Sequence, residues 1–383
     1  MGIKLGEICK FQSGGTPAKG KAEYFNGYIP WITTTALNGS KIDESDAVDW
    51  ITEKAIRESA AKIVPAFSIM VGTRVGVGKV AVNIVDMSTS QDIISLIGID
   101  ENTWSKDFLC KFIQWKSAYL NSQARGATIK GIKIDVLAAL ELPVISLKEQ
   151  QHISTVIDAT KQIISSRQQE LQKLDELVKA RFVELFGDTI LNPFGWKKDL
   201  LGTVCDVRDG THDSPQYYES GYPLVTSKNV TGGKIDLTDC SLICEADFKK
   251  ISERSKVDIG DIIMPMIGTV GKPVIVDIEP NFAIKNVSLI KFKADSRVLN
   301  IYIRALLQSD YFDDAVLSKV RGGTQKFISL GDIRKLEVLV PPMELQEQFA
   351  TFIKQTDKSK VVVQKALDEA QNLFDSLMQE YFG

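Results

Sequence analysis

The sequence predicts a mixed α/β (α+β) protein of two tandem globular domains, each followed by a long helix, with the two helices paired as an antiparallel coiled coil. Three observations carry this prediction: the sequence repeats itself, each half holds short β-rich runs, and each half ends in a long heptad pattern. A chain of 383 residues is long enough for two domains with sizeable cores.

The internal repeat is clearest at its edges. Leu5-Gly6-Glu7-Ile8-Cys9 matches Leu201-Gly202-Thr203-Val204-Cys205, which lies 196 positions later (201 against 5). Arg125–Lys130 matches Arg321–Lys326, and Glu184–Gly187 matches Glu380–Gly383, both at that same offset. Self-similarity at one fixed offset is the signature of a duplicated architecture. The two halves are therefore expected to share one scaffold.

The middle of each half is less regular. Gly39-Ser40-Lys41-Ile42-Asp43 matches Gly232-Gly233-Lys234-Ile235-Asp236, and Ser95-Leu96-Ile97 matches Ser288-Leu289-Ile290, both at an offset of 193 (232 against 39). Compared with the first half, the second half is thus three residues shorter before this middle part and three residues longer after it. The segments at the two ends of each half agree, whereas the segments between them differ. This pattern indicates one fixed scaffold whose surface varies independently of it.

The first four-fifths of each half reads as short strands between Gly, Asn and Asp turns, for example 66–71 and 80–85. A shorter helical stretch interrupts each set, near 108–121 and 299–318. Strands mixed with helices predict α/β globular domains. Trp31 and Tyr24 are expected to lie in the core rather than on a contact surface.

The last part of each half predicts a long helix. Ser146-Leu147-Lys148-Glu149 has the capping-box pattern, and Pro341-Pro342 opens the second helix where a missing N–H costs nothing. Apolar residues then alternate at spacings of three and four over about five heptads, as in a coiled coil. The predicted seam is Ile153, Ile157, Ile164, Leu171, Leu174, Val178 and Leu185, with Phe349, Ile353, Val363, Leu367, Phe374 and Leu377 on the second helix.

Four polar residues, Thr160, Arg167, Arg181 and Lys360, occupy core positions of the heptads, where they weaken a seam but fix its register. The heptads fit a parallel and an antiparallel pair equally well. Two equivalent domains at opposite ends of a spacer favour the antiparallel pair. The expected boundaries are 1–145 (first globular domain), 146–187 (first long helix), 188–196 (linker), 197–341 (second globular domain) and 342–383 (second long helix).

Composition excludes several classes of protein. The chain is 44% hydrophobic and 25% charged, and no apolar run nears the roughly 20 residues of a membrane span. The start of the sequence has no signal-peptide pattern, so we expect a cytoplasmic protein. The net charge of −3 does not exclude nucleic-acid binding, which depends on where Lys and Arg lie.

We expect the chain to have no catalytic activity and no metal or nucleotide site of its own. Five cysteines without a CxxC pair and only two histidines argue against zinc and favour buried free thiols. The run 72–80 fails the phosphate-loop spacing, because Val80 stands where Ser or Thr would bind magnesium. Asn192-Pro193-Phe194-Gly195 resembles part of an amino-methyltransferase signature, but it lacks the second proline and lies between the repeats. We interpret it as linker.

Polar, aromatic and basic residues cluster at corresponding places in the two halves and form the candidate DNA contacts. Such side chains donate to phosphates and to base edges. The first half offers Ser13, Thr16, Lys19, Lys21, Thr33, Thr34, Thr35, Arg74, Lys79 and Lys130. The second half offers Thr211, His212, Tyr217, Tyr218, Ser227, Lys228, Asn229, Lys272, Lys285, Arg321, Gln325 and Lys326.

These segments resemble the specificity subunits of type I restriction-modification enzymes. Phe11-Gln12-Ser13-Gly14-Gly15-Thr16-Pro17 followed by 29–32 is similar to the opening of a target recognition domain in that family. Asp209-Gly210-Thr211-His212-Asp213-Ser214-Pro215 followed by 222–225 is similar to another version of that opening. The segments 90–96 and 330–342 and the Gln-rich helix starts at 149–151 and 346–348 also fit. The resemblance covers essentially the whole chain.

The resemblance implies a non-catalytic subunit that binds double-stranded DNA. Each domain would read one half of a split site, and the helices would space the domains and dock two methyltransferase subunits. S-adenosylmethionine, ATP and Mg²⁺ would be used by the methyltransferase and restriction subunits, with no cofactor in this chain. Because the two halves differ in detail, the site would be asymmetric. Pro143 lacks the second proline seen at Pro341-Pro342.

Two other classes of function remain open at this stage. The chain could be an autonomous sequence-specific DNA-binding or regulatory protein, which would bind DNA tightly without partners. It could also be a coiled-coil scaffold whose globular domains bind proteins, in which case salt-dependent DNA binding would be absent.

Overall fold

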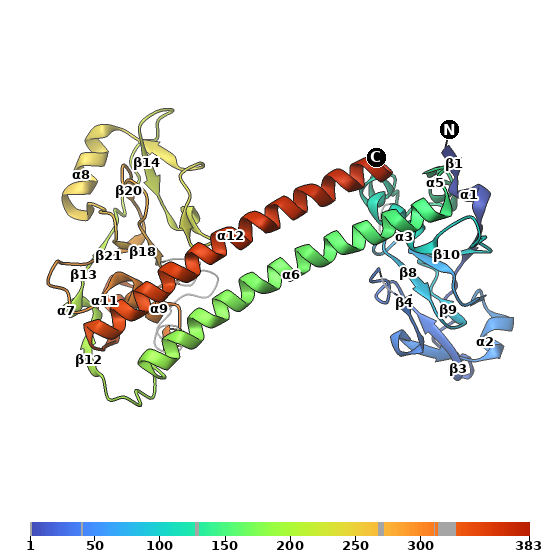
Figure 1. Cartoon of the computed structure of the whole chain (residues 1–383), viewed down its shortest axis with the longest axis horizontal. Helices are drawn as coiled ribbons and strands as arrows, with labels where there is room; N and C mark the ends of the chain where they lie inside the picture. Colours follow the sequence, from blue (N-terminus) through green and yellow to red (C-terminus); the bar gives the residue numbers. More distant parts are fainter. Residues whose placement is uncertain (1, 40, 127–129, 267–271, 310, 313–326) are drawn as a thin grey trace. The chain divides into compact units, whose positions relative to one another are not determined.

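The computed structural model describes residues 2–39, 41–126, 130–266, 272–309, 311–312 and 327–383. Contacts divide the chain into two compact units (Figure 1). Unit 1 is Met1–Gln168 with Lys365–Gly383, and unit 2 is Gln169–Gln364. Each unit therefore combines a globular part with pieces of both long helices.

The globular part of unit 1 contains two main sheets. The first has the order β2 (Lys10–Ser13), β10 (Ile93–Ile97), β7 (Ile69–Gly72), β8 (Val80–Asn83) and β4 (Lys41–Ile42), antiparallel except at β4. The second has the order β5 (Asp49–Ile51), β3 (Phe25–Ile32), β9 (Met87–Thr89) and β6 (Ile63–Val64), with β3 and β9 parallel. A short pair joins β1 (Gly2–Lys4) to β11 (Glu141–Pro143).

Helices cover these sheets because their apolar faces must be buried. They are α1 (Leu5–Ile8), α2 (Glu53–Glu58), α3 (Lys106–Trp115), α4 (Ser117–Ser122) and α5 (Ile134–Ala138), with 3₁₀ turns η1 (Ala22–Tyr24) and η2 (Glu44–Asp46). Phe108 and Phe112 of α3 pack with Ile69 and Leu96 of the first sheet in one core. Tyr24 and Trp31 are buried, as predicted.

Unit 2 repeats this plan. Its first sheet has the order β13 (Asp206–Asp209), β21 (Val287–Lys291), β18 (Ile262–Pro265) and β19 (Val274–Ile275). Its second has the order β17 (Ser241–Ile243), β14 (Tyr222–Val225) and β20 (Ala283–Ile284), with β14 and β20 parallel. Further pairs join β12 (Lys197–Leu200) to β22 (Glu337–Val340) and β15 (Val230–Thr231) to β16 (Lys234–Ile235).

The helices of unit 2 also correspond to those of unit 1. They are α7 (Leu201–Val204), α8 (Glu245–Ser255), α9 (Asn300–Leu307) and α11 (Leu330–Arg334), with the 3₁₀ turn η3 (Ser227–Asn229). The sheet order β2-β10-β7-β8 is matched by β13-β21-β18-β19, and the parallel pair β3-β9 is matched by β14-β20. The sequence repeat is thus a structural repeat, and the predicted mixed α/β fold is confirmed.

Two predicted elements differ in their bounds. The run predicted as a strand from Ala66 becomes β7 only at Ile69, because Phe67 has φ of 61°, outside the extended region. The helical stretch predicted near 108–121 is two helices, α3 and α4, which meet at Lys116. The stretch predicted near 299–318 contains α9, and its residues 310 and 313–318 lie outside the described residues.

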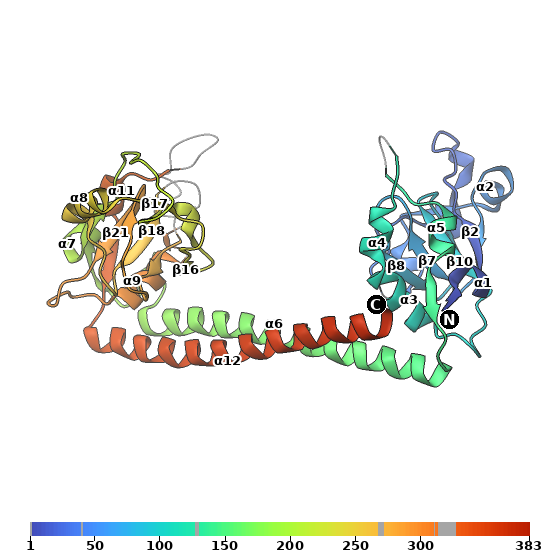
Figure 2. The same cartoon turned by 90° about the horizontal axis from the view of Figure 1, so that it is seen from above.

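The two long helices are α6 (Leu147–Phe186) and α12 (Met343–Phe382), each of 40 residues and so about 60 Å long (Figure 2). Ser146 Oγ accepts the Glu149 N–H at 3.2 Å, which is one of the two bonds of the predicted capping box. Every residue of the predicted seam is buried or half-buried.

The long helices run antiparallel within each unit. In unit 1, Ile153 and Ile157 near the start of α6 share a core with Met378 and Phe382 at the end of α12. In unit 2, the rings of Phe182 and Phe349 are 5.5 Å apart, so the end of α6 lies beside the start of α12. A continuous coiled coil along the whole length of both helices stays a prediction.

A buried glutamine ties the start of each long helix to the adjacent globular part. Gln150 accepts a hydrogen bond from the Ser105 N–H (2.8 Å) and donates to the carbonyls of Thr103 (3.0 Å) and Ile145 (3.1 Å). Gln346, 196 positions later, makes the same three bonds, with the Leu299 N–H and the carbonyls of Arg297 and Pro341. The side chains of Gln150 and Gln346 are fully buried. The Gln-rich motifs are therefore structural anchors.

Gln150→Leu is expected to lower the free energy of unfolding of unit 1 by about 2–3 kcal/mol, because it removes three hydrogen bonds that a fully buried side chain makes to the backbone. Denaturant unfolding measures this change. Gln151→Leu, at the exposed neighbouring position, is the control and should change stability by less than about 0.5 kcal/mol. Equal effects of the two variants would contradict the anchoring role.

Candidate nucleic-acid interface

In unit 1, several predicted contact residues meet at one edge of the first sheet. Ser13 at the end of β2 pairs with Ile94 at the start of β10, and Gly72 at the end of β7 pairs with Ile93. The turns that follow these strands hold Thr16, Arg74 and Lys79. Since neighbouring antiparallel strands alternate in direction, the end of β2, the start of β10 and the end of β7 share this edge.

A glycine is required where the chain leaves the sheet in both units. A Cβ on Gly14 would lie 2.2 Å from the Ser90 carbonyl oxygen, and one on Gly210 would lie 2.4 Å from the Ile284 carbonyl oxygen. No side chain fits at such separations, so the backbone can approach this closely only at glycine. These turns lead directly into the segments that hold Thr16 and His212.

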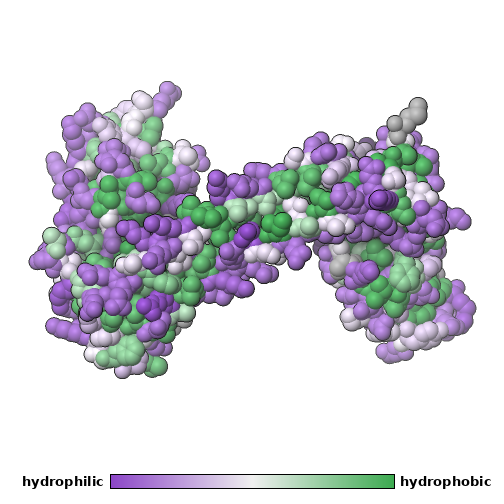
Figure 3. Space-filling view, in the orientation of Figure 1, coloured by the Kyte–Doolittle hydropathy of each residue, from purple (hydrophilic) through white to green (hydrophobic). Residues whose placement is uncertain are grey.

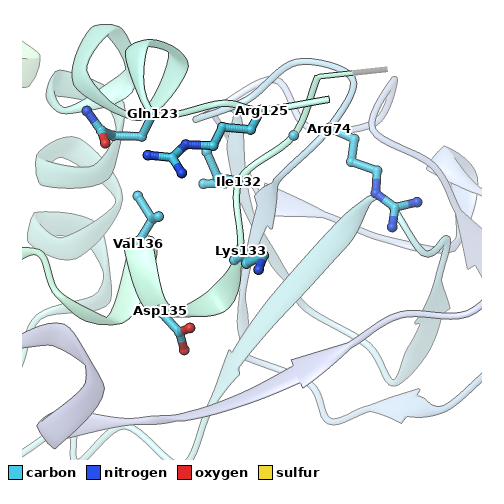
Figure 4. Close-up of a pocket in the computed structure, with 8 residues that line it drawn as sticks. Arg74, Gln123, Arg125, Ile132, Lys133, Asp135 and Val136 are labelled. Atoms are coloured by element: carbon cyan, nitrogen blue, oxygen red, sulfur yellow. The ribbon is translucent and has the colours of Figure 1, made fainter. Parts of the chain in front are cut away.

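A cleft of about 590 Å³ opens beside this edge and is lined by three basic residues, Arg74, Arg125 and Lys133. Figure 4 shows Arg125 and Gln123 on the segment after α4, Lys133 and Asp135 at the start of α5, and Arg74 directed away from Arg125. Arg125 and Gly131 exchange two backbone hydrogen bonds of 2.9 and 3.0 Å, which close the loop that contains Lys130. Exposed cations around a cleft can contact DNA phosphates without reading sequence.

A second cavity of unit 1, of about 460 Å³, brings Thr35 and Lys79 together. Thr35 Oγ1 lies 2.8 Å from Thr33 Oγ1, so these two hydroxyls share one hydrogen bond and retain further capacity for ligands. Thr34 between them is buried, so its side chain does not reach the surface.

In unit 2, the corresponding edge gathers Thr211, His212 and Lys285. The Thr211 N–H donates to the Ile284 carbonyl at the end of β20, and the Lys285 ammonium donates to Ser214 Oγ at 2.7 Å. Ser227 and Lys228 follow the end of β14, beside this edge, because the Lys285 N–H donates to the Val225 carbonyl. Tyr217 and Tyr218 are exposed, and Tyr218 bridges to Leu242 of β17.

A charged cluster lies at the same edge of unit 2. The buried Asp209 carboxylate accepts a hydrogen bond from His212 Nε2 (2.8 Å) and pairs with Arg254 at the end of α8. His212 Nδ1 lies 2.9 Å from the Asn286 side-chain oxygen. Hydrogen bonding to Asn286 and to Asp209 raises the pKa of His212 above its ordinary value. The sequence indicated His212 as a contact and Asp209 only as part of the motif 209–215, and it gave no sign of Arg254.

The remaining candidates fall into four groups. Asn229 is buried and accepts the Thr226 N–H at 3.0 Å, so it shapes a turn, and we omit it and Thr34 from the interface. Lys130 and Lys272 are exposed beside the loops at this edge, whereas Lys19 is exposed and Lys21 donates to Tyr24 at 2.9 Å, near α2. The candidates Arg321, Gln325 and Lys326 lie outside the described residues.

The linker after α6 is a turn with a structural role for its asparagine. Asn192 has φ of 49° and its side chain bonds both the N–H and the carbonyl of Trp196, each at 2.9 Å. The indole N–H of Trp196 in turn donates to the Phe186 carbonyl at 3.0 Å. These contacts explain Asn192-Pro193-Phe194-Gly195 as a turn motif.

The thiols are free, and burial raises the pKa of Cys9, Cys110 and Cys205 to about 12. Such groups stay protonated at neutral pH and are poor nucleophiles or metal ligands. Across the described part of the chain, no group of three His, Cys, Asp or Glu residues is placed to hold a metal ion. No described helix is both long and apolar enough to cross a membrane.

Comparison with known proteins identifies the family. The family described as "Type I restriction modification DNA specificity domain" matches the chain twice, over residues 1–176 and 193–370. The chain therefore belongs to the type I restriction-modification DNA specificity family, and the resemblance drawn from its sequence is confirmed.

Curated relatives agree with this assignment. The MjaIX specificity subunit of Methanocaldococcus jannaschii is 26% identical over 98% of this chain and 90% of its own length. The EcoKI specificity subunit of Escherichia coli is 22% identical over 93% of this chain and 82% of its own length. The EcoR124I/EcoR124II specificity subunit of Escherichia coli is 31% identical, over 49% of this chain and 47% of its own length.

Solved structures share the fold. A chain described as "Structural basis underlying complex assembly and conformational transition of the type I R-M system" aligns over 100% of this chain and 97% of its own length, with a TM-score of 0.65 and 17% identity. The S subunit of a type I system from M. genitalium aligns over 100% of this chain and 96% of its own length, with a TM-score of 0.57 and 15% identity.

Proposed function

We propose that this chain is the DNA sequence-specificity subunit of a type I restriction-modification complex and reads a split, asymmetric DNA site. The main observation behind this proposal is that the same edge of the first sheet recurs in both units. In both units, a glycine turn after the first strand of the sheet leads to exposed polar and basic residues, and these residues differ between the units. Two equivalent scaffolds with different surfaces suit two different half-sites.

Within this proposal, 1–145 and 197–341 are the target recognition domains, 146–187 and 342–383 are the spacer helices, and 188–196 is the linker. In this complex the chain is a non-catalytic subunit. Two methyltransferase subunits would supply S-adenosylmethionine-dependent adenine methylation, and restriction subunits would supply ATP-dependent cleavage with Mg²⁺. The complex would act in the cytoplasm.

The surface of the long helices supports docking of a partner in two copies. Leu177 and Leu373 occupy equivalent positions, 196 apart, and both are about half exposed. Val361 and Val362 of α12 are also exposed, and Figure 3 shows apolar side chains along the helices. The recurrence of an exposed leucine at Leu177 and Leu373 fits a symmetric pair of subunits, whereas Val361 and Val362 have serines at the equivalent positions of α6.

The test is DNA binding by the complex co-purified with its methyltransferase subunits. Exchanging Arg125 and Lys133 together for glutamine should weaken binding to all duplexes. It should also reduce the slope of log K against log salt by about 1.8, since each phosphate contact contributes about 0.9. Lys10→Gln, at the opposite end of β2, is the matched control.

If the slope of log K against log salt is unchanged in the double variant, the cleft is not part of the DNA interface. Tight specific binding by the chain without partners would favour the autonomous DNA-binding protein. Absence of salt-dependent DNA binding by the complex would favour the protein-interaction scaffold.

A further inference from the structure

We propose that Asp209, His212 and Arg254 form a phosphate-contacting cluster in unit 2 whose charge is set by a single proton on His212, so that DNA binding through this unit is linked to pH. This inference rests on the proposed function and goes beyond it. It assigns a site to residues from β13, from the following loop and from the end of α8, and it names the DNA backbone phosphate as the ligand.

The geometry fixes the role of the carboxylate. The side chain of Asp209 is only 9% exposed, yet its partners His212 and Arg254 are 60% and 64% exposed. The Ser255 hydroxyl also donates to the Asp209 backbone carbonyl, at 2.5 Å, which anchors the end of α8 to the end of β13. Asp209 is therefore a positioning residue, because it holds two exposed cationic side chains on one surface.

The surroundings of His212 favour its doubly protonated form. Its Nε2 faces the Asp209 carboxylate and its Nδ1 faces the Asn286 amide oxygen, and both of these oxygens accept hydrogen bonds. A neutral imidazole has one N–H and could serve only one of them. Hydrogen bonding to Asn286 and to Asp209 raises the pKa of His212, against the smaller opposing effects of burial and of Arg254.

The proton decides the net charge of the cluster. With neutral His212, the charges of Asp209 and Arg254 cancel. With protonated His212, the cluster carries one net positive charge, and Arg254, which uses one N–H donor on Asp209, has others to offer to a phosphate. Lys285, held to Ser214 on the same edge, adds a second cation. The pocket beside Arg254 is also lined by two carboxylates, Asp213 and Asp247, and by Lys250.

Unit 1 lacks the carboxylate and the histidine at the positions equivalent to Asp209 and His212. The positions 196 before Asp209 and His212 are Ser13 and Thr16, both neutral. Thr16 instead accepts the Gln91 N–H, at 3.5 Å. The linkage to pH is therefore expected only for the part of the DNA that unit 2 contacts.

The chain is well suited to a direct test, because His152 is its only other histidine and lies exposed on α6. The experiment measures binding of the full chain, in complex with its methyltransferase subunits, to a labelled mixed-sequence DNA duplex at pH 6–9 and several salt concentrations. Variants His212→Gln and His152→Gln are compared with the unchanged protein.

Affinity of the unchanged protein should fall as pH rises through the pKa of His212, by at most tenfold per pH unit, the limit for one linked proton. Its salt slope should be larger by about 0.9 at low pH than at high pH. His212→Gln should abolish both dependences, and His152→Gln should keep them. Arg254→Gln should weaken binding at every pH.

Three outcomes are distinguishable. DNA binding that is salt-dependent but independent of pH, or a pH dependence that survives in His212→Gln, would overturn this inference and leave the proposed function intact. A pH dependence lost in both histidine variants would overturn the assignment to His212. Complete absence of salt-dependent DNA binding would overturn the proposed function together with this inference.

Discussion

Replacing Phe186 by alanine is expected to lower the free energy of unfolding of unit 2 by about 3–5 kcal/mol, the usual cost of removing a buried aromatic ring. Phe186 is fully buried near the end of α6. Its ring lies 4.8 Å from Tyr302 of α9, 5.0 Å from Phe182 and 5.5 Å from Phe349 of α12. One ring thus joins both long helices to the globular part of unit 2.

Denaturant unfolding followed by circular dichroism measures this loss. Val183→Ala, one turn earlier on α6 and 55% exposed, is the matched control and should cost less than about 0.5 kcal/mol. Phe382, 196 positions later, contacts Phe108 and Phe112 at 5.2 and 5.8 Å, so Phe382→Ala should destabilise unit 1 in the same way. A cost below 1 kcal/mol for Phe186→Ala would contradict this role.

Shortening both long helices by one heptad is expected to abolish methylation of the original DNA site. Removing 167–173 from α6 and 362–368 from α12 keeps the phase of the heptads. The deleted segments lie between the contacts Lys161–Phe374 and Asp175–Lys360. Seven residues correspond to about 10 Å of helix, which equals the rise of about three base pairs.

The variant should therefore favour a site with a gap about three base pairs shorter, with the two half-site sequences unchanged. Gln169→Ala, an exposed substitution within α6, controls for local damage to the helix and should leave the site as it was. Methylation of the original site by the doubly shortened protein would contradict a spacing role for the helices.

Much of the fold was accessible from the sequence because duplication and heptad spacing are regular patterns. The offset of 196 relates Gln150 to Gln346 and Phe186 to Phe382, and the structure gives the members of each pair equivalent roles. The heptads alone fit either direction, so the predicted antiparallel orientation rested on the two equivalent domains that the helices must separate. Contacts such as Phe182 with Phe349 show that it is antiparallel within each unit.

The candidate site was less accessible, since its members come from distant segments. Arg254 lies 45 residues after Asp209, and nothing in a helix-forming run such as 245–255 indicates that its last arginine pairs with a strand end. Thr34 and Asn229 are the opposite case, because they were predicted as contacts but their side chains are buried. Polar residues in turns often serve the backbone, as Asn229 does for Thr226.

The measurement that most directly tests the central proposal is mapping of methylated adenines in cells that co-express this chain with its methyltransferase subunits. A second strain carries a version in which residues 1–145 come from another member of the family. The unchanged chain should direct methylation to a two-part asymmetric site, and the exchange should alter one part and leave the other and the gap intact. A change in both parts, or a single continuous site, would contradict the proposal that each unit reads its own half.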